Sequence, residues 1–122
     1  MKKDLKMYKF DDASETLSSQ ILTEIATAKK CGIEYIVIGD LSKKTNGFKR
    51  GSILSNLVYQ LNNIKSNTPI KIGIKNTYED INFYKTILEK VPNLEFHFDM
   101  NNAQKYSSDT LASWNTFINE IN

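Results

Sequence analysis

Apolar residues recur along the chain in two alternating spacings, one typical of helices and the other of buried strands. A possible capping box at residues 12–15 precedes the first helical stripe, and Gly32 stands where that helix would end. Three further stripes follow. The four stripes comprise Leu17, Ile21, Ile25 and Ala28; Ile53, Leu57, Leu61 and Ile64; Ile81, Tyr84, Leu88 and Val91; and Leu111, Trp114, Ile118 and Ile121. The spacing therefore predicts four helices.

Three short apolar segments separate these stripes and are typical of buried strands: residues 33–39, 70–75 and 94–99. A polar loop, 40–51, lies between the first strand and a helix that Ser52 is expected to cap. Strands joined by helices run parallel with right-handed crossovers. The expected fold is therefore α/β, with three parallel strands and four helices. A sheet of three strands has two open edges. Either other parts of the chain cover these edges, or the chain is a piece of a larger barrel.

The length of 122 residues fits one domain and one hydrophobic core. We expect a basic N-terminal extension over residues 1–11 and βα units over residues 12–122. A complete eight-fold β/α barrel is excluded, because such barrels need roughly 200 residues or more. The net charge of +2 is too small to indicate nucleic acid binding by itself.

Cysteine, histidine and hydropathy narrow the class of protein further. The single cysteine, Cys31, excludes an internal disulfide, and with only one histidine, His97, the usual structural zinc patterns are absent. The N-terminus lacks the apolar stretch of a signal peptide, and the longest apolar run, residues 35–38, is far too short for a membrane span. We therefore expect a soluble, intracellular protein with no membrane partner.

Three quoted segments carry a resemblance to a known family. They are KKCGIEYIVIGDLS at 29–42, IKIGIKNT at 70–77 and NLEFHFDMNNA at 93–103. In order and spacing they resemble strand ends of endonuclease IV-type barrels, in the AP endonuclease and xylose isomerase-like TIM barrel superfamily. The resemblance implies a partial (β/α) barrel fragment made of the fourth, fifth and sixth βα units. It also implies a DNA repair lineage whose other members include sugar-phosphate isomerases.

The departures from the family pattern concern its metal ligands. The resemblance implies a zinc cluster held by a His, a Glu, and an Asp with a second His; the corresponding positions here are Gly39, Lys75, Asp99 and Asn102. Only Asp99 survives as a metal position, because glycine has no ligating side chain and an ammonium repels the metal. Hydrolysis in that family depends on metal-activated water. We therefore expect no cofactor and a degenerate metal site, although the family implies zinc.

Lys75, His97 and Asp99 are the candidate catalytic residues. Lys75 and Asp99 fall at carboxyl-terminal strand ends, where ligand sites of parallel α/β sheets lie. Lys75 is a candidate Schiff-base lysine with Asp99 as proton shuttle. The alternative is an ion pair in which the ammonium replaces the lost metal charge, because an unpartnered buried cation is costly. His97 is either a general base or a ligand, or it lies inside a polar patch or on an edge strand facing water.

Four cations gather in the loop before the second helix: Lys43, Lys44, Lys49 and Arg50. A basic, glycine-containing loop before a helix N-terminus predicts a site for phosphate or nucleic acid. Phe48, within this loop, is able to stack on a base. The alternative is an ordinary solvated basic loop.

Three functions remain open at the level of the sequence. The first is a remnant or binding module of the AP endonuclease lineage without metal-dependent hydrolysis of its own. The second is a segment of an AP endonuclease or a sugar-phosphate isomerase or epimerase, active only with complementary barrel strands from another chain. The third is a small enzyme that uses Lys75. The candidate partners are nucleic acid or phosphate at the basic loop, and a second copy or a complementary barrel chain at the sheet edges.

Overall fold

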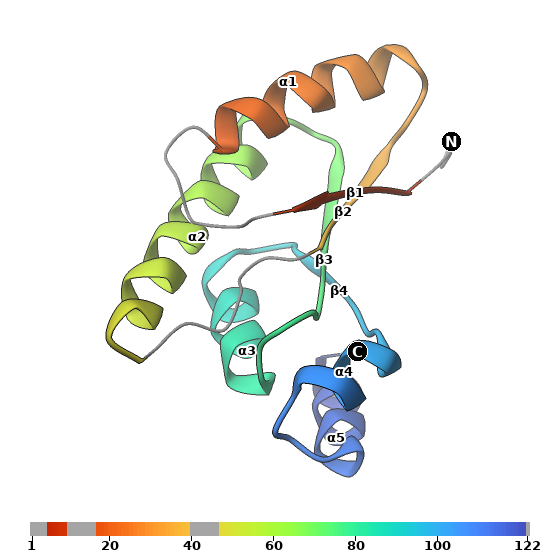
Figure 1. The fold of residues 1–122 in the computed structure, drawn as a ribbon. Helices are drawn as coiled ribbons and strands as arrows, with labels where there is room; N and C mark the ends of the chain where they lie inside the picture. The colour runs from red at the N-terminus through yellow and green to blue at the C-terminus, as the bar shows by residue number, and fades with distance from the viewer. Residues whose placement is uncertain (1–4, 10–16, 40–46, 122) are drawn as a thin grey trace.

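The computed structural model describes residues 5–9, 17–39 and 47–121, which form a parallel sheet covered by helices (Figure 1). The elements are β1 (Leu5–Lys9), α1 (Leu17–Lys30), β2 (Tyr35–Gly39), α2 (Gly47–Asn67), β3 (Lys71–Lys75), α3 (Ile81–Lys90), β4 (Glu95–His97), α4 (Met100–Tyr106) and α5 (Leu111–Ile121). The strands described pair in the order β1-β2-β3-β4, each parallel to its neighbour. The predicted α/β class with helix-connected parallel strands is confirmed.

The structure adds one strand and one helix to the prediction. β1 lies inside the segment expected as a basic extension and pairs with β2 over its whole length. Its sequence LKMYK contains no β-branched residue, so the usual strand signal is weak. α4 occupies residues expected as a loop, and β4 is only three residues long. α2 begins at Gly47, five residues before the expected cap at Ser52.

The sequential strand order puts the crossover helices on one face of the sheet. α1 contacts α2, and α2 contacts α3, so the three form a layer (Figure 1). Ile36, Ile38, Ile72 and Ile74 belong to the hydrophobic core beneath this layer, and each is at most 1% exposed. α2 is the longest helix at 21 residues, yet neither it nor any other helix in the described ranges is long and apolar enough to cross a membrane.

Residues of the opposite parity in β2, β3 and β4 lie on the other face of the sheet. Tyr35 and Gly73 are buried there, whereas Lys75 and His97 are only partly buried and Glu95 is exposed. This face, which we call the polar face, carries the ionisable residues of the strands. Alternation along each strand therefore separates an aliphatic layer under the helices from a polar layer opposite.

Trp114 fixes α5 against the last strand. Its ring stacks on Phe96 of β4 with 6.2 Å between centroids, and its Nε1 donates to Ser107 Oγ at 3.1 Å. The prediction that Leu111 and Ile121 also point inward is wrong, since they are 41% and 40% exposed. α5 lies at the end of the described sheet, so only its middle turns reach β4.

The end of α1 agrees with the sequence, whereas the start of α3 is capped differently from a simple N-cap. Gly32 has a positive φ of 79°, and Ile33 N donates to Ala28 O at 3.0 Å, which confirms the expected end of α1. The capping box at 12–15 lies outside the described residues. Asp80 is the N-cap of α3, but its side chain does not cap that helix. Asp109 Oδ2 accepts from Ile81 N at 2.8 Å instead.

Candidate functional site

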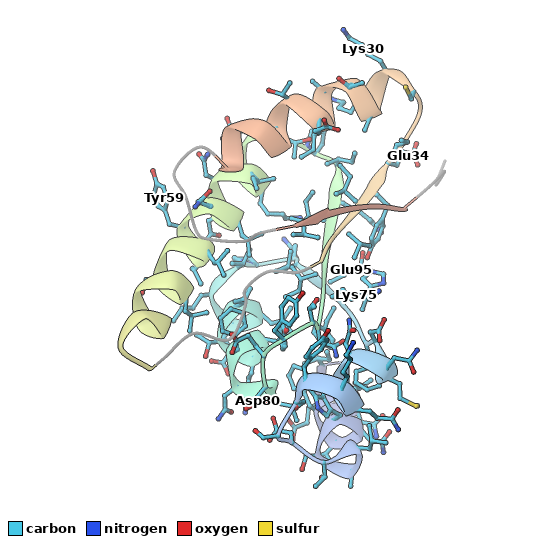
Figure 2. The ribbon with its side chains drawn as sticks, viewed as in Figure 1. Lys30, Glu34, Tyr59, Lys75, Asp80 and Glu95 are labelled. Carbon is cyan, nitrogen blue, oxygen red and sulfur yellow. The ribbon has the colours of Figure 1, made fainter. Side chains whose placement is uncertain are left out.

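The candidate site lies at the carboxyl ends of β2, β3 and β4. Gly39, Lys75 and His97 are the last residues of these strands, and Lys75 pairs in register with His97. Because Ile38 pairs with Ile74, the next positions, Gly39 and Lys75, are also neighbours. The parallel sheet therefore gathers the sequence-predicted positions at one edge. Figure 2 labels Lys75 near the middle of the view, well below Lys30 at the top.

Lys75 and Asp99 form the predicted ion pair. The distance from Lys75 Nζ to Asp99 Oδ2 is 3.0 Å, and the two side chains are 32% and 23% exposed. The other oxygen, Asp99 Oδ1, accepts from the backbone N–H of Asn102 at 2.8 Å and so caps α4. The Asn102 hydrogen bond is the main reason that the pKa of Asp99 lies below 3.8; partial burial opposes this shift, and Lys75 adds to it.

Asn76 holds Asp99 in position. The buried Asn76 amide donates from Nδ2 to Asp99 O at 2.9 Å and accepts at Oδ1 from Asp99 N. Asn102 Nδ2 donates in turn to Asn76 O at 2.9 Å. A side-chain amide thus continues the β3–β4 pairing beyond the end of β4. Asp99 therefore lies outside the strand, contrary to the expected strand 94–99, yet still meets Lys75.

A second polar contact crosses the sheet above Gly73. Tyr35 Oη and His97 Nε2 are hydrogen-bonded, and the two rings meet edge to face with centroids 5.2 Å apart. A Cβ at Gly73 would lie 2.7 Å from His97 Cδ2 and 2.8 Å from Tyr35 Oη. Only glycine at this position lets the two side chains meet across β3.

Glu95 acts on the phenol of Tyr35 from the same face of the sheet. Burial is the first reason that the pKa of Tyr35 lies above its ordinary value; a hydrogen bond to the Glu95 carboxylate and its charge add to the shift. The donor and acceptor roles of Tyr35 Oη and His97 Nε2 depend on the tautomer of the imidazole. Tyr35, His97 and Glu95 thus form one polar cluster on this face of the sheet.

Sequence reasoning missed Tyr35 as a site residue. It lies within the apolar run 35–38 and looks like core, and its partner His97 is 62 positions away. One signal was present, because Gly73 interrupts a strand of isoleucines and lysines, and glycine inside a strand marks close approach of other groups. His97 lies on β4, the last strand of the described sheet, and is partly buried, in agreement with the polar-patch interpretation.

The residues at this edge do not fit the zinc cluster that the resemblance implies. Gly39 supplies no donor atom, and Lys75 brings a positive charge within 3.0 Å of Asp99 Oδ2. Asp99 Oδ1 and the Asn102 amide are both engaged in hydrogen bonds that hold the start of α4. In the part of the chain that the structure describes, no three His, Cys, Asp or Glu side chains are grouped to hold a metal ion.

The basic loop is described only in part. Lys43 and Lys44 lie outside the described residues, whereas Lys49 and Arg50 belong to the first turn of α2 rather than to a loop. Since α2 follows the carboxyl end of β2, its first turn lies toward the same edge of the sheet as Lys75.

Comparisons of the chain with protein-family models, with curated proteins and with solved structures found no match.

Proposed function

We propose that the chain is a segment of an endonuclease IV-like barrel lineage that binds phosphate-bearing ligands, nucleic acid among them, without metal-dependent hydrolysis. The observation that carries this proposal is that both carboxylate oxygens of Asp99 already have partners within the chain. Its two carboxylate oxygens are engaged, one by the Lys75 ammonium and the other by the first turn of α4. This ion pair supports the proposal, because in the proposed lineage a metal ion, and not an ammonium, would contact the Asp99 carboxylate.

Lys75 is able to bind an anion while it remains paired with Asp99. An ammonium has three donors, and Asp99 takes one of them. The side chain is 32% exposed, so a phosphate oxygen is able to approach it. The first turn of α2, which contains Lys49 and Arg50 in its sequence, follows the carboxyl end of β2 and offers helix N–H groups there. We expect this binding to occur inside the cell.

A titration of DNA binding tests the proposal. The probe is a fluorescent duplex with a tetrahydrofuran abasic analogue, followed by anisotropy at several salt concentrations with inorganic phosphate as competitor. The double variant Lys49→Ala/Arg50→Ala should lower the slope of log K against log salt by about 2, because each lost phosphate contact lowers it by about 0.9. Lys29→Ala/Lys30→Ala, exposed at the far end of α1, is the matched control and should leave the slope unchanged.

Two results would overturn this function. If the Lys49→Ala/Arg50→Ala variant bound DNA with the same salt dependence as the Lys29→Ala/Lys30→Ala control, the first turn of α2 would not be part of the binding site. Cleavage of the abasic duplex that depends on added zinc, and that Asp99→Asn abolishes, would show a working metal centre at this edge.

The polar cluster of His97, Tyr35 and Glu95 favours one alternative function. A Tyr held between an imidazole and a carboxylate is arranged to pass protons, as an isomerase of the same superfamily requires. Exchange of deuterium from solvent into a sugar phosphate, measured by NMR with any complementary barrel chain present, tests this alternative. Loss of exchange in Tyr35→Phe would support it, and no exchange by the wild type would exclude it for the sugar phosphates assayed.

A further inference from the structure

The Lys75–Asp99 pair presents a charged donor and a charged acceptor side by side. Lys75 Nζ lies 3.0 Å from Asp99 Oδ2, and the two side chains are 32% and 23% exposed. An ammonium has three donor hydrogens, and Asp99 engages one of them. Both side chains lie at the carboxyl edge of the sheet, where ligands of parallel sheets bind. A ligand that meets Lys75 at this edge therefore meets the Asp99 carboxylate as well.

The Asp99 carboxylate selects against a ligand that is only an anion. The hydrogen bond from Asn102 N, with a further contribution from Lys75, lowers the pKa of Asp99, so this carboxylate is charged at neutral pH. A charged carboxylate accepts hydrogen bonds and donates none. It has about four acceptor positions, and Lys75, Asn102 N and Asn101 N engage three of them. A phosphate that also brings a hydroxyl donor satisfies the remaining position and offsets the repulsion between the two anions.

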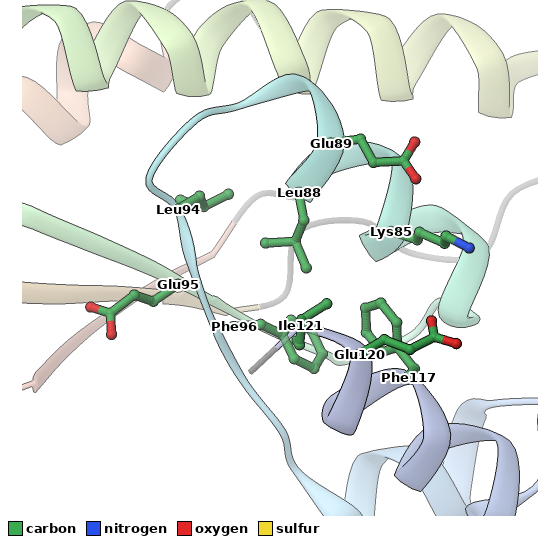
Figure 3. A pocket seen from close by; sticks show the side chains of 9 residues that line it. All are labelled: Lys85, Leu88, Glu89, Leu94, Glu95, Phe96, Phe117, Glu120 and Ile121. Atoms are coloured by element: carbon green, nitrogen blue, oxygen red, sulfur yellow. The ribbon is translucent and has the colours of Figure 1, made fainter.

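The hollow between α3 and α5 is less suited to such a ligand (Figure 3). Its volume is about 570 Å³, and its wall carries Glu89 and Glu120 besides Lys85. Carboxylates outnumber ammonium groups on this wall, so the hollow repels a phosphate. The Lys75–Asp99 pair lies instead at an open edge and is partly exposed. An open edge suits a polymer that passes over the surface, whereas small-molecule sites bury most of their ligand.

We propose that the Lys75–Asp99 pair reads the ribose of RNA: Lys75 donates to a backbone phosphate, and the neighbouring 2′-hydroxyl donates to Asp99 Oδ2. This inference rests on the proposed function, because it names the nucleic acid that the same site binds. In RNA the 2′-hydroxyl stands on the carbon next to the one that bears the 3′ phosphate, so the ligand's donor and acceptor are neighbours, like those of the pair. DNA lacks this hydroxyl, and its phosphate meets the Asp99 carboxylate with no hydrogen bond to offset the repulsion.

Anisotropy titrations of the full chain with short fluorescent strands of one sequence test this preference. The strands are RNA, DNA, and RNA whose 2′-hydroxyls are all methylated, which keeps the ribose oxygen but removes its donor. The wild type should bind RNA about tenfold more tightly than either of the other strands, which is the scale of one hydrogen bond to a charged group. This comparison needs no variant, so it does not depend on how well any variant folds.

Asp99→Asn separates the acceptor for the hydroxyl from the cap of α4. Asparagine remains a good N-cap, and with its oxygen at Asn102 N it places an amide nitrogen, which only donates, where Oδ2 was. The variant should bind RNA and DNA with equal affinity, and it should bind DNA more tightly than the wild type does, because the carboxylate charge is gone. Glu89→Gln removes one exposed carboxylate on the wall of the hollow and should keep the wild-type preference.

Different results overturn this inference and the proposed function. Equal binding of all the strands by the wild type, or an RNA preference that persists in Asp99→Asn, would overturn the recognition of ribose and leave phosphate binding in place. Tighter binding of glycerol 3-phosphate than of inorganic phosphate, without any preference for RNA, would assign the pair to a small hydroxyl-bearing phosphate and overturn RNA as the ligand. No binding of any strand or of inorganic phosphate would overturn both.

Discussion

Replacing Lys75 by Met and Asp99 by Leu, singly and together, measures how strongly the ion pair stabilises the fold. The pair is partly exposed, at 32% and 23%, so its coupling should be about 0.5–1 kcal/mol. A fully buried pair would lose about 3–5 kcal/mol when one partner is removed. Asp99→Leu should cost about 1 kcal/mol more than Lys75→Met, because it also removes the N-cap that accepts from Asn102 N.

The assay is urea unfolding of the four proteins at neutral pH, with the m-value checked for constancy. The double variant should be less destabilised than the sum of the single variants by the coupling energy. Lys71→Met, at an exposed position on the same strand, is the control and should change stability by less than about 0.5 kcal/mol. Strictly additive effects would refute the reasoning, because they would show that the two side chains do not interact.

Four further predictions concern other contacts of the fold and metal binding. Gly73→Ala should destabilise by about 1–3 kcal/mol, because its Cβ would lie 2.7 Å from His97, and His97→Ala should relieve part of that cost in a denaturant titration. Tyr84→Phe removes the acceptor of two buried backbone amides and should lower the unfolding free energy by about 1–3 kcal/mol. Asp80→Ala removes the acceptor of Ser107 and Ser108 and should selectively speed amide exchange in the α4–α5 connection. Dialysis against zinc followed by elemental analysis should find no stoichiometric metal.

The pH dependence of stability follows from the lowered pKa of Asp99. A carboxyl group whose folded pKa is depressed stabilises the fold above its unfolded pKa, near 3.8, and loses this contribution as pH falls through the folded value. The wild type should therefore exceed Asp99→Asn in unfolding free energy at pH 6, and the difference should shrink below pH 4. A difference that grows toward low pH would contradict the depressed pKa.

The elements that could be predicted are those whose residues carry their own local signal. The isoleucine spacing of β2 and β3 indicates strands, and the apolar stripes of α1 and α3 indicate helices. Gly32 indicates where α1 ends. β1 carries no such signal, since LKMYK becomes a strand only by pairing with β2. The early start of α2 at Gly47 was also hidden, because two glycines precede its apolar stripe.

The same distinction applies to the candidate site. Lys75 and Asp99 could be paired from the sequence because both were expected at the carboxyl ends of adjacent parallel strands, and Asp99 follows β4 closely enough to meet Lys75. The contact between Tyr35 and His97 depends on the register of three strands and on the missing side chain at Gly73. The role of Asn76 was equally hidden, because its amide replaces a strand that ends early. Contacts that depend on register across several strands leave little trace in a local pattern.

The most direct test of the central claim is a ¹³C NMR titration of the Asp99 side-chain carboxyl, in the wild type and in Lys75→Met, with and without excess zinc. The Asn102 hydrogen bond and the Lys75 ion pair together predict a wild-type midpoint below 3.8. The ion pair further predicts a higher midpoint in Lys75→Met and no change in the Asp99 signal on adding zinc at neutral pH. A zinc-induced shift of that signal in the wild type, or a midpoint that does not respond to Lys75→Met, would contradict the claim that Lys75 occupies the position of the metal.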